Sequence, residues 1–290
     1  MAIINWLVAP LQYAFMQRAL IAALVVGVLC AILGCYVVLK SMAFIGDAMA
    51  HAVLPGIAIA YLLGGNLTLG ALIAAVIISL GIGLLSRQGT IREDTAIGIL
   101  FSAALSLGIV LISSIRSYAV DLSHILFGNV LGVSTQDLIV TIAAAIVILM
   151  MVAFLYRRFL VVLFDPILAV TQRLKVGLLR NILLIILAVT IVVSIQTVGV
   201  GLVAALLVTP PATAYLLTRR LPSMMALSAI FGALSSLVGL YASFYANVSS
   251  GAAIVFTATM IFLVVFIFSP QKGVVIGLFK RWMGKRQPAE

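Results

Sequence analysis

The feature that most constrains this chain is a succession of apolar runs, each about as long as a helix that crosses a bilayer. Crossing the hydrocarbon core takes roughly 20 mainly apolar residues. The chain has 290 residues, of which 65% are hydrophobic and 8% charged, more apolar surface than one water-soluble core can bury. We therefore predict an all-α fold, a single polytopic transmembrane bundle over 1–290 with roughly eight or nine spans. The runs lie near residues 15–39, 43–63, 67–86, 94–115, 137–156, 180–197, 199–217, 223–244 and 251–269.

The positive charge of the chain predicts its orientation. The formal net charge is +10, and if nine runs cross, nearly all basic residues fall on one side. Cytoplasmic loops carry an excess of Lys and Arg. We therefore predict a multi-pass membrane protein with a basic cytoplasmic tail over 270–290, and no nucleic-acid partner. The residues on this side are Lys40, Arg87, Arg92, those between 157 and 180, Arg219, Arg220 and those between 272 and 286.

Two segments on the other side are too polar, or too poorly patterned, to cross. Residues 1–14 contain Trp6 and Tyr13 and predict an interfacial segment. Between the fourth and fifth runs, the stretch "RSYAVDLSHILFGNVLGVSTQD" predicts a short helix on the outer face. It contains His124, which is interpreted either as a surface histidine or as a secondary ligand.

The longest cytoplasmic connection, residues 158–180, combines a turn signal with positive charge. The turn signal is Asp165–Pro166, and the basic amphipathic run that follows includes Arg173 and Lys175. Such a run is typical of a helix that lies on anionic lipid headgroups. A helix that docks onto a cytoplasmic partner is the alternative.

One polar pair stands inside an apolar run, in the stretch "AFIGDAMAHAVLPG". Asp47 and His51 are four residues apart, so on a helix they share a face. Ionisable groups at membrane depth are costly and usually face a cavity or each other, which indicates function. A carboxylate oxygen and an imidazole nitrogen suit manganese, iron or zinc. The alternatives are a structural Asp–His hydrogen bond and a proton relay.

Two ligands are too few to hold a metal ion alone. Water or further protein groups would have to complete the site, and a symmetric homodimer would supply a second Asp47–His51 pair across its axis. Pro55 and Gly56 follow in the same run. Such helix breakers are tolerated at membrane depth where the backbone lines a cavity or packs against protein.

A second acidic motif, "GTIREDTAIGILF", stands at the cytoplasmic start of the fourth run. Glu93 and Asp94 are predicted to lie at a helix N-terminus, where carboxylates complement the helix dipole. The alternative is a cytoplasmic gate or a secondary ligand at the exit.

Common catalytic motifs are missing from the sequence. It contains no G-x-x-x-x-G-K-[ST] phosphate loop, no H-E-x-x-H and no G-x-S-x-G. We therefore expect a protein that is not an enzyme, does not hydrolyse ATP through such a loop and holds no tightly bound cofactor.

The chain resembles the membrane permeases of bacterial ABC importers for zinc, manganese or iron. The resemblance extends from "FMQRALIAALVVGVLCAILGCYVVLKSMAFIGDAMAHAVLPG" through "REDTAIGILFSAALSLGIVL" and "GVGLVAALLVTPPATAYLL" to "VSSGAAIVFTATMIFLVVFIFSP". The block "GDAMAHAVLPG" is the most specific of these. One departure is Ser249, which stands where the family often has proline before the last span.

The resemblance implies a fold like that of type II ABC importers and a homodimer in a bacterial plasma or inner membrane. It implies two partners, a cytoplasmic ATPase dimer and an extracytoplasmic metal-binding protein. Asp47 and His51 would be the transmembrane metal ligands, and residues 158–180 would couple the permease to the ATPase. The segment Leu122 to Val133 would be a short gating helix at the mouth of the pathway.

The predicted function is import of a divalent transition metal as substrate, driven by the separate ATPase. Mixed nitrogen and oxygen donors favour manganese or iron and allow zinc. The outer stretch "SHILFGNVLGVS" resembles the manganese and iron members, so manganese is favoured. The alternatives are an ABC permease for a metal chelate or cobalamin-like cargo, and an ion-coupled secondary metal transporter.

Overall fold

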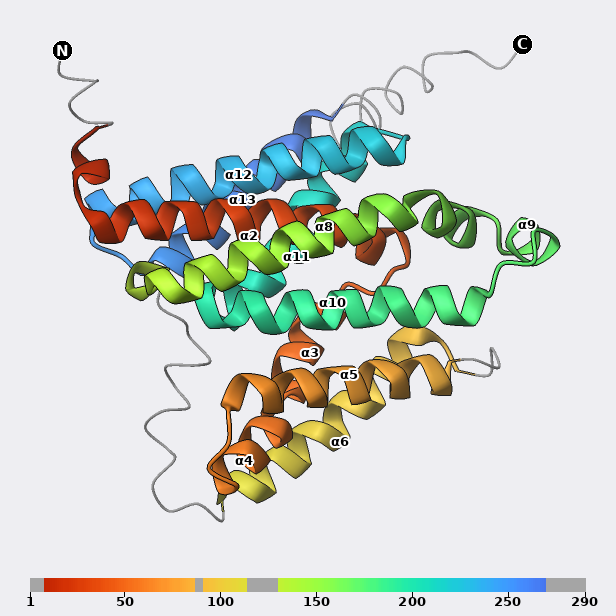
Figure 1. The fold of residues 1–290 in the computed structure, drawn as a ribbon. Helices are drawn as coiled ribbons and strands as arrows, with labels where there is room; N and C mark the ends of the chain where they lie inside the picture. The colour runs from red at the N-terminus through yellow and green to blue at the C-terminus, as the bar shows by residue number, and fades with distance from the viewer. Residues whose placement is uncertain (1–7, 87–90, 114–129, 270–290) are drawn as a thin grey trace, which may run out of the picture.

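The computed structural model describes residues 8–86, 91–113 and 130–269, and these are helical almost throughout (Figure 1). Within them there is no strand, and nine helices or helix pairs are long and apolar enough to cross a membrane, with α3 and α4 together making one. The predicted all-α bundle is therefore confirmed. The elements are η1 (Ala9–Gln12), α2 (Ala14–Leu39), α3 (Ile45–Ala52), α4 (Leu54–Leu62), α5 (Leu67–Leu85), α6 (Glu93–Ser113), η2 (Val130–Gly132), α8 (Thr135–Phe164), α9 (Pro166–Thr171), α10 (Val176–Val198), α11 (Val200–Leu217), α12 (Leu221–Ala246) and α13 (Ser250–Phe268).

The fifth span is longer than the sequence predicted. Helix α8 continues to Phe164, and α10 begins at Val176, so much of the predicted connection 158–180 is helical. The arginines at 157 and 158 do not end α8, because Arg is compatible with a helix interior. The helix ends at Asp165 instead, before Pro166. At 30 residues α8 is about 45 Å long, so it extends past the hydrocarbon core.

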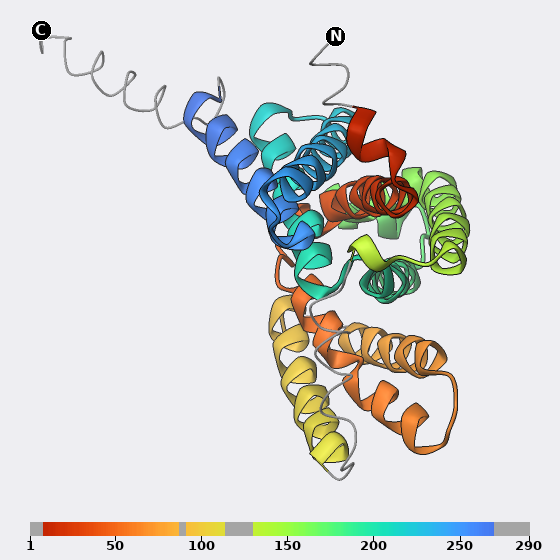
Figure 2. The ribbon, with the colours of Figure 1, turned by 90° about the vertical axis from the view of Figure 1, so that its left-hand side faces the viewer.

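The helices form two groups. Helix α2 lies in the larger one, where it packs against α8, α11 and α12. Helices α4, α5 and α6 form the smaller group, which stands apart from the larger bundle in Figure 2. Helix α5 packs against α10, and α3 contacts α5, α6, α10 and α11. The short helix α3 therefore lies at the seam between the two groups.

Small residues allow the central helices to approach closely, as is common between membrane helices. A Cβ on Gly34 of α2 would run into the carbonyl oxygen of Leu207 in α11. The Leu207 carbonyl lacks its usual hydrogen bond within α11, because Pro211, four residues later, has no N–H to donate. Gly34 therefore lets α2 cover a carbonyl group that the proline leaves free within α11.

We predict that Gly34→Ala lowers the melting temperature of the purified protein, because the added Cβ forces α2 and α11 apart. Overpacking of this kind costs about 1–3 kcal/mol. Gly201 is exposed on α11 with open space around it, so Gly201→Ala is the control and should be nearly neutral. Thermal unfolding in detergent measures both variants. An unchanged midpoint for Gly34→Ala would contradict the close packing of α2 on α11.

Candidate metal centre

Asp47 and His51 both lie on α3 and share one of its faces, as the sequence predicted. His51 Nε2 lies 3.7 Å from Asp47 Oδ1, beyond the roughly 2.7–3.2 Å of a hydrogen bond. The side chains are 47% exposed for Asp47 and 29% for His51. The Asp47 carboxylate and the His51 imidazole are thus close together, do not hydrogen-bond each other and remain accessible at the surface of the chain.

The opposite face of α3 holds the helix in place. Ala48, Met49 and Ala52 are buried, and they lie close to residues of α5 and α6. Gly46 packs against Ala204 of α11, where a Cβ would come within 3.3 Å of the Ala204 Cα. Small side chains therefore seat α3 in the seam and leave Asp47 and His51 on its accessible face.

The end of α3 follows from the residues after His51. Pro55 has no N–H with which to bond the carbonyl of His51, four residues before it. The N–H of Val53 contacts this carbonyl instead, and the chain starts α4 at Leu54. The break that the sequence suggested near Pro55 therefore falls immediately after α3, which carries both Asp47 and His51.

Aromatic rings flank the imidazole on its α6 side. The ring centroids of His51 and Phe101 are 6.3 Å apart. Phe101 also meets Phe44 edge to face, with centroids 5.5 Å apart. The two phenylalanines make an apolar wall beside the accessible Asp47–His51 pair.

The donor set that one chain offers is incomplete. Among the residues that the structure describes, no group of three or more His, Cys, Asp or Glu side chains is positioned to hold a metal ion. Asp47 and His51 would provide one oxygen and one nitrogen donor. Water, backbone groups or another chain would have to supply the remaining ligands.

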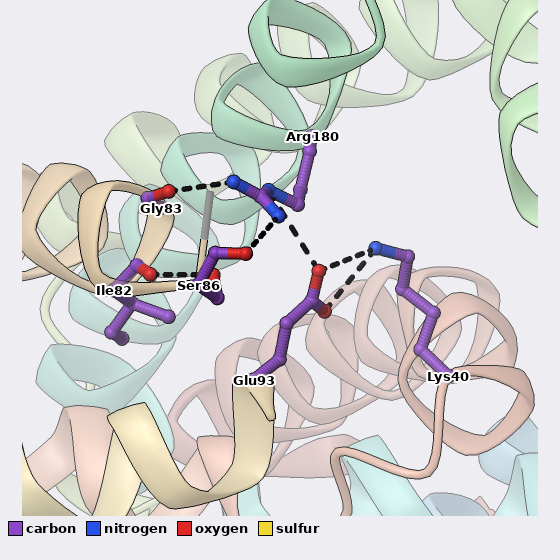
Figure 3. A network of polar contacts seen from close by, with 6 residues as sticks. All are labelled: Lys40, Ile82, Gly83, Ser86, Glu93 and Arg180. Carbon is purple, nitrogen blue, oxygen red and sulfur yellow. Dashed lines mark hydrogen bonds and ion pairs between the residues drawn. The ribbon is translucent and has the colours of Figure 1, made fainter. Parts of the chain in front are cut away.

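Glu93 lies in a second polar cluster, at the end of the bundle where α2 ends and α6 begins. Lys40 Nζ lies 3.2 Å from both carboxylate oxygens of Glu93. Arg180 Nε lies 3.8 Å from Glu93 Oε1. Figure 3 shows the carboxylate of Glu93 between the two cations, which come from α2 and α10. All three side chains are mostly buried, with exposures of 15–21%.

Arg180 also closes the end of α5. Its Nη2 donates to the carbonyl of Gly83 at 2.6 Å and its Nη1 to that of Ser86 at 3.0 Å. The last carbonyls of a helix have no partner within the helix, and a cation there complements the dipole. Arg180 therefore joins α10 to α5 and, through Glu93, to α6.

Several similarities to known proteins bear on the family. Residues 12–269 match the ABC 3 transport family. The chain is 48% identical to the manganese transport system membrane protein MntC of Halalkalibacterium halodurans over 276 residues, covering 95% of this chain and 94% of the other. It is 43% identical to a probable iron transport system membrane protein of Haemophilus influenzae over 265 residues, covering 91% and 97%.

Among solved structures, the chain is similar to one in "PsaBC from Streptococcus pneumoniae in complex with Fab". The TM-score is 0.81 and the identity 36%, covering 98% of this chain and 100% of that one. The chain belongs to the ABC 3 transport family. The resemblance seen in the sequence is thus confirmed, and the protein is a multi-pass membrane permease with the fold of this family.

The connection between α8 and α10 forms a short helix in this ABC 3 family permease. Asp165 caps α9, because its Oδ1 accepts a hydrogen bond from the N–H of Leu168 at 2.8 Å. Arg173 has a left-handed backbone with φ 55°, and Lys175 occupies the N-cap position of α10. Pro166 starts α9, as the turn signal predicted. Figure 1 shows α9 beyond the ends of its neighbours, at one end of the bundle.

The remaining predicted residues fall in three places. Asp94 lies exposed in the first turn of α6, beside Glu93, at the predicted helix N-terminus. His124 and most of the segment Leu122 to Val133 lie outside the described residues. The structure places only the end of this segment, where η2 forms. Ser249 stands at the N-cap of α13 with φ −54°, which is also suitable for proline. The substitution is therefore compatible with the local backbone.

Sequence reasoning missed the partners of Glu93. Lys40 and Arg180 were treated only as part of the positive charge on one side of the membrane. The available signal was that all three residues lie near span ends on the same side. Because spacing along the chain says nothing about which helices are neighbours, that signal did not identify the pairing.

We predict that Arg180→Gln lowers the melting temperature, because the carbonyls of Gly83 and Ser86 lose their charged donor. Loss of a partner for a buried polar group costs about 1–3 kcal/mol. Arg180→Lys should recover only part of the loss, since an ammonium does not reproduce the fork of a guanidinium. Arg173→Gln removes an exposed charge near the same end and serves as the control in thermal unfolding. Equal midpoints for Arg180→Gln and Arg173→Gln would contradict this role.

Proposed function

We propose that this chain is the membrane permease subunit of an ABC importer that carries a divalent transition-metal cation into the cell, with manganese favoured. The observation that carries the proposal is the Asp47–His51 pair on the accessible face of α3, within a membrane-spanning segment. An ionisable pair at that depth is expensive unless it serves a pathway. Its open geometry, at 3.7 Å, leaves both groups free to bind a third atom.

The choice of manganese is supported by the donor chemistry and by the relatives. A carboxylate and an imidazole bind manganese, iron and zinc. Relatives with names that specify manganese transport include MntC, and another relative is named for iron transport. Manganese is therefore favoured, iron is the main competitor, and zinc is chemically admissible.

A homodimer would complete the site. In a single chain the side chain of Asp47 is about half exposed. Because it lies in a membrane span, the exposed part would face lipid if nothing else covered it. A carboxylate facing hydrocarbon is unfavourable, so another polar surface has to cover it. A second copy related by a two-fold axis would bring its own Asp47 and His51 to the same place. Four protein ligands and water would then replace part of the hydration shell of the cation.

The segment between α8 and α10 fits the role of the contact with a separate ATPase subunit. Helix α9 extends beyond its neighbours, and Ile167 and Val170 are 80% and 66% exposed on it. These two positions are three apart and share a face. Apolar side chains exposed on a short helix outside the spans mark a contact with protein or membrane, and we assign this one to the ATPase subunit. This end of the bundle carries Lys40, Arg180 and Arg220, and we assign it to the cytoplasm.

The chain supplies the metal ligands, and its two helix groups can pack in two alternative ways. The ATPase supplies the energy that drives the change between them. An extracytoplasmic binding protein delivers the cation to the outer mouth of the dimer. Asp47 and His51 of both copies bind it at the dimer axis. Movement of α9 and α10 by the ATPase then changes how the groups pack and opens the pathway inward.

The first test is cellular uptake of radioactive manganese, with iron and zinc as competitors. We expect Asp47→Ala and His51→Ala each to reduce uptake by more than about tenfold. Loss of a residue that only orients a metal ligand already lowers metal affinity or activity by about that factor. Asp137→Asn, which removes a carboxylate from the first turn of α8, is the matched control and should retain uptake. Membrane levels of all variants are compared by immunoblot.

The outcomes separate the candidate functions. Normal transport by both alanine variants would refute the proposed site. Transport that persists without the ATPase subunit would indicate an ion-coupled secondary transporter. Uptake that free cations neither support nor compete with would indicate a chelate cargo.

A further prediction concerns α9. Ile167→Asp should reduce the ATPase subunit recovered with the purified permease by about fivefold or more, because an apolar contact is replaced by a charge. Gln172→Asp adds the same charge at an exposed position just after α9 and is the control. Equal recovery with both variants would show that α9 does not contact the ATPase.

A further inference from the structure

The ion pair between Lys40 and Glu93 is connected by short segments to both sides of the Asp47–His51 site. Lys40 caps the end of α2, and only the turn Ser41–Phe44 separates it from α3. Ser41 has a left-handed backbone with φ 57°, and Met42 is buried, so the turn is compact. The position of Lys40 therefore constrains the start of the helix that carries Asp47.

Glu93 is connected to the other side of the site through α6. Phe101 stands two turns further along this helix, about 12 Å from Glu93 along the axis. The ring of Phe101 contacts both His51 and Phe44. Any shift of the start of α6 relative to the α2–α3 turn would therefore change the aromatic wall beside His51.

The two cations hold Glu93 differently. Arg180 is fixed by short hydrogen bonds to two carbonyls of α5 and approaches Glu93 at 3.8 Å. Lys40 Nζ bonds both oxygens of Glu93 at 3.2 Å, longer than the roughly 2.7–2.9 Å of a strong charge-assisted bond. Arg180 thus anchors the start of α6 to α5 and α10. Lys40, which lies closer to Glu93 than Arg180 does, adds a charged contact that joins this unit to the α2–α3 turn, beside the direct packing of α3 on α6.

We infer that Lys40 and Glu93 are positioning residues for the proposed cation site. Their ion pair sets the place of Asp47, through the α2–α3 turn, relative to the wall that α6 builds beside His51. The inference rests on the proposed function, because it assigns the pair a role in binding the transported cation. Neither residue is assigned as a ligand.

The test is the kinetics of manganese uptake by a set of neutral variants. Lys40→Gln and Glu93→Gln should each raise KM by about five- to tenfold, which corresponds to about 1–1.4 kcal/mol of lost binding. The maximal rate should change less than KM, because the ligands remain present. The double variant should raise KM no further than either single variant, since the two residues act as one pair. Lys40→Arg keeps the charge and should return KM to near the wild-type value.

The control is Arg92→Gln, which removes an exposed positive charge next to Glu93 in the sequence and outside the ion pair. It should leave KM unchanged. If a glutamine variant does not reach the membrane, Glu93→Asp gives a second test, because it keeps the charge and withdraws the carboxylate by one methylene group. It should also raise KM for manganese.

Asp47→Ala is measured in the same assay so that the two hypotheses fail separately. If Asp47→Ala transports normally, the proposed site is wrong. If Asp47→Ala is inactive but Lys40→Gln, Glu93→Gln and Glu93→Asp keep the wild-type KM, the function stands and the positioning role is wrong. Independent effects of Lys40→Gln and Glu93→Gln that multiply in the double variant would also overturn it.

Discussion

The cost of placing charge in a hydrocarbon environment governs how this chain distributes its few ionisable residues. Each such group within or near a span needs an opposite charge, a hydrogen-bond donor or water, because lipid offers none of these. Glu93 meets this requirement within the chain, between Lys40 and Arg180. Asp47 does not, since its side chain is about half exposed and its distance to His51 is too long for a hydrogen bond. The Glu93 cluster balances its charges within the chain, whereas the Asp47–His51 pair requires something further to face it.

The packing of α3 shows how a short helix can keep Asp47 and His51 at the surface while its other residues are buried. Its buried residues are one glycine, three alanines, Ile45 and Met49, and it fits closely between α5, α6 and α11. The helix ends just beyond His51 because Pro55 cannot continue the hydrogen-bonding pattern. A longer helix with larger buried residues would push the two groups of helices apart. The small residues around Asp47 and His51 are therefore as much a part of the candidate site as these two side chains.

The sequence predicted the spans and the candidate ligands for physical reasons that are local. Apolar runs of bilayer length identify helices whatever their neighbours, and a spacing of four places Asp47 and His51 on one face. Helix α8 continues past the predicted run to Phe164, and the arginines at 157 and 158 lie within it because arginine does not break a helix. The Lys40–Glu93–Arg180 cluster was not predicted, because its members come from three distant parts of the chain. Its formation depends on the packing of α2, α6 and α10, which no local pattern encodes.

The same cluster bears on how a cytoplasmic ATPase would act on a cation site in the membrane. Arg180 lies in the second turn of α10, directly after the segment with α9, and is tied to α5 and α6. A displacement of α10 would therefore carry the ends of α5 and α6 with it, including Glu93. Lys40 joins this unit to the turn that leads to Asp47 through its 3.2 Å contact with Glu93, beside the direct packing of α3 on α6. If the ends move as one body, the strain of the movement falls on that contact, and the α2–α3 turn either follows α6 or separates from it. Separation would move Asp47 relative to Phe101, and a turn that follows α6 would move α3 relative to α11, so either response would change the shape of the site without direct contact between the ATPase and α3.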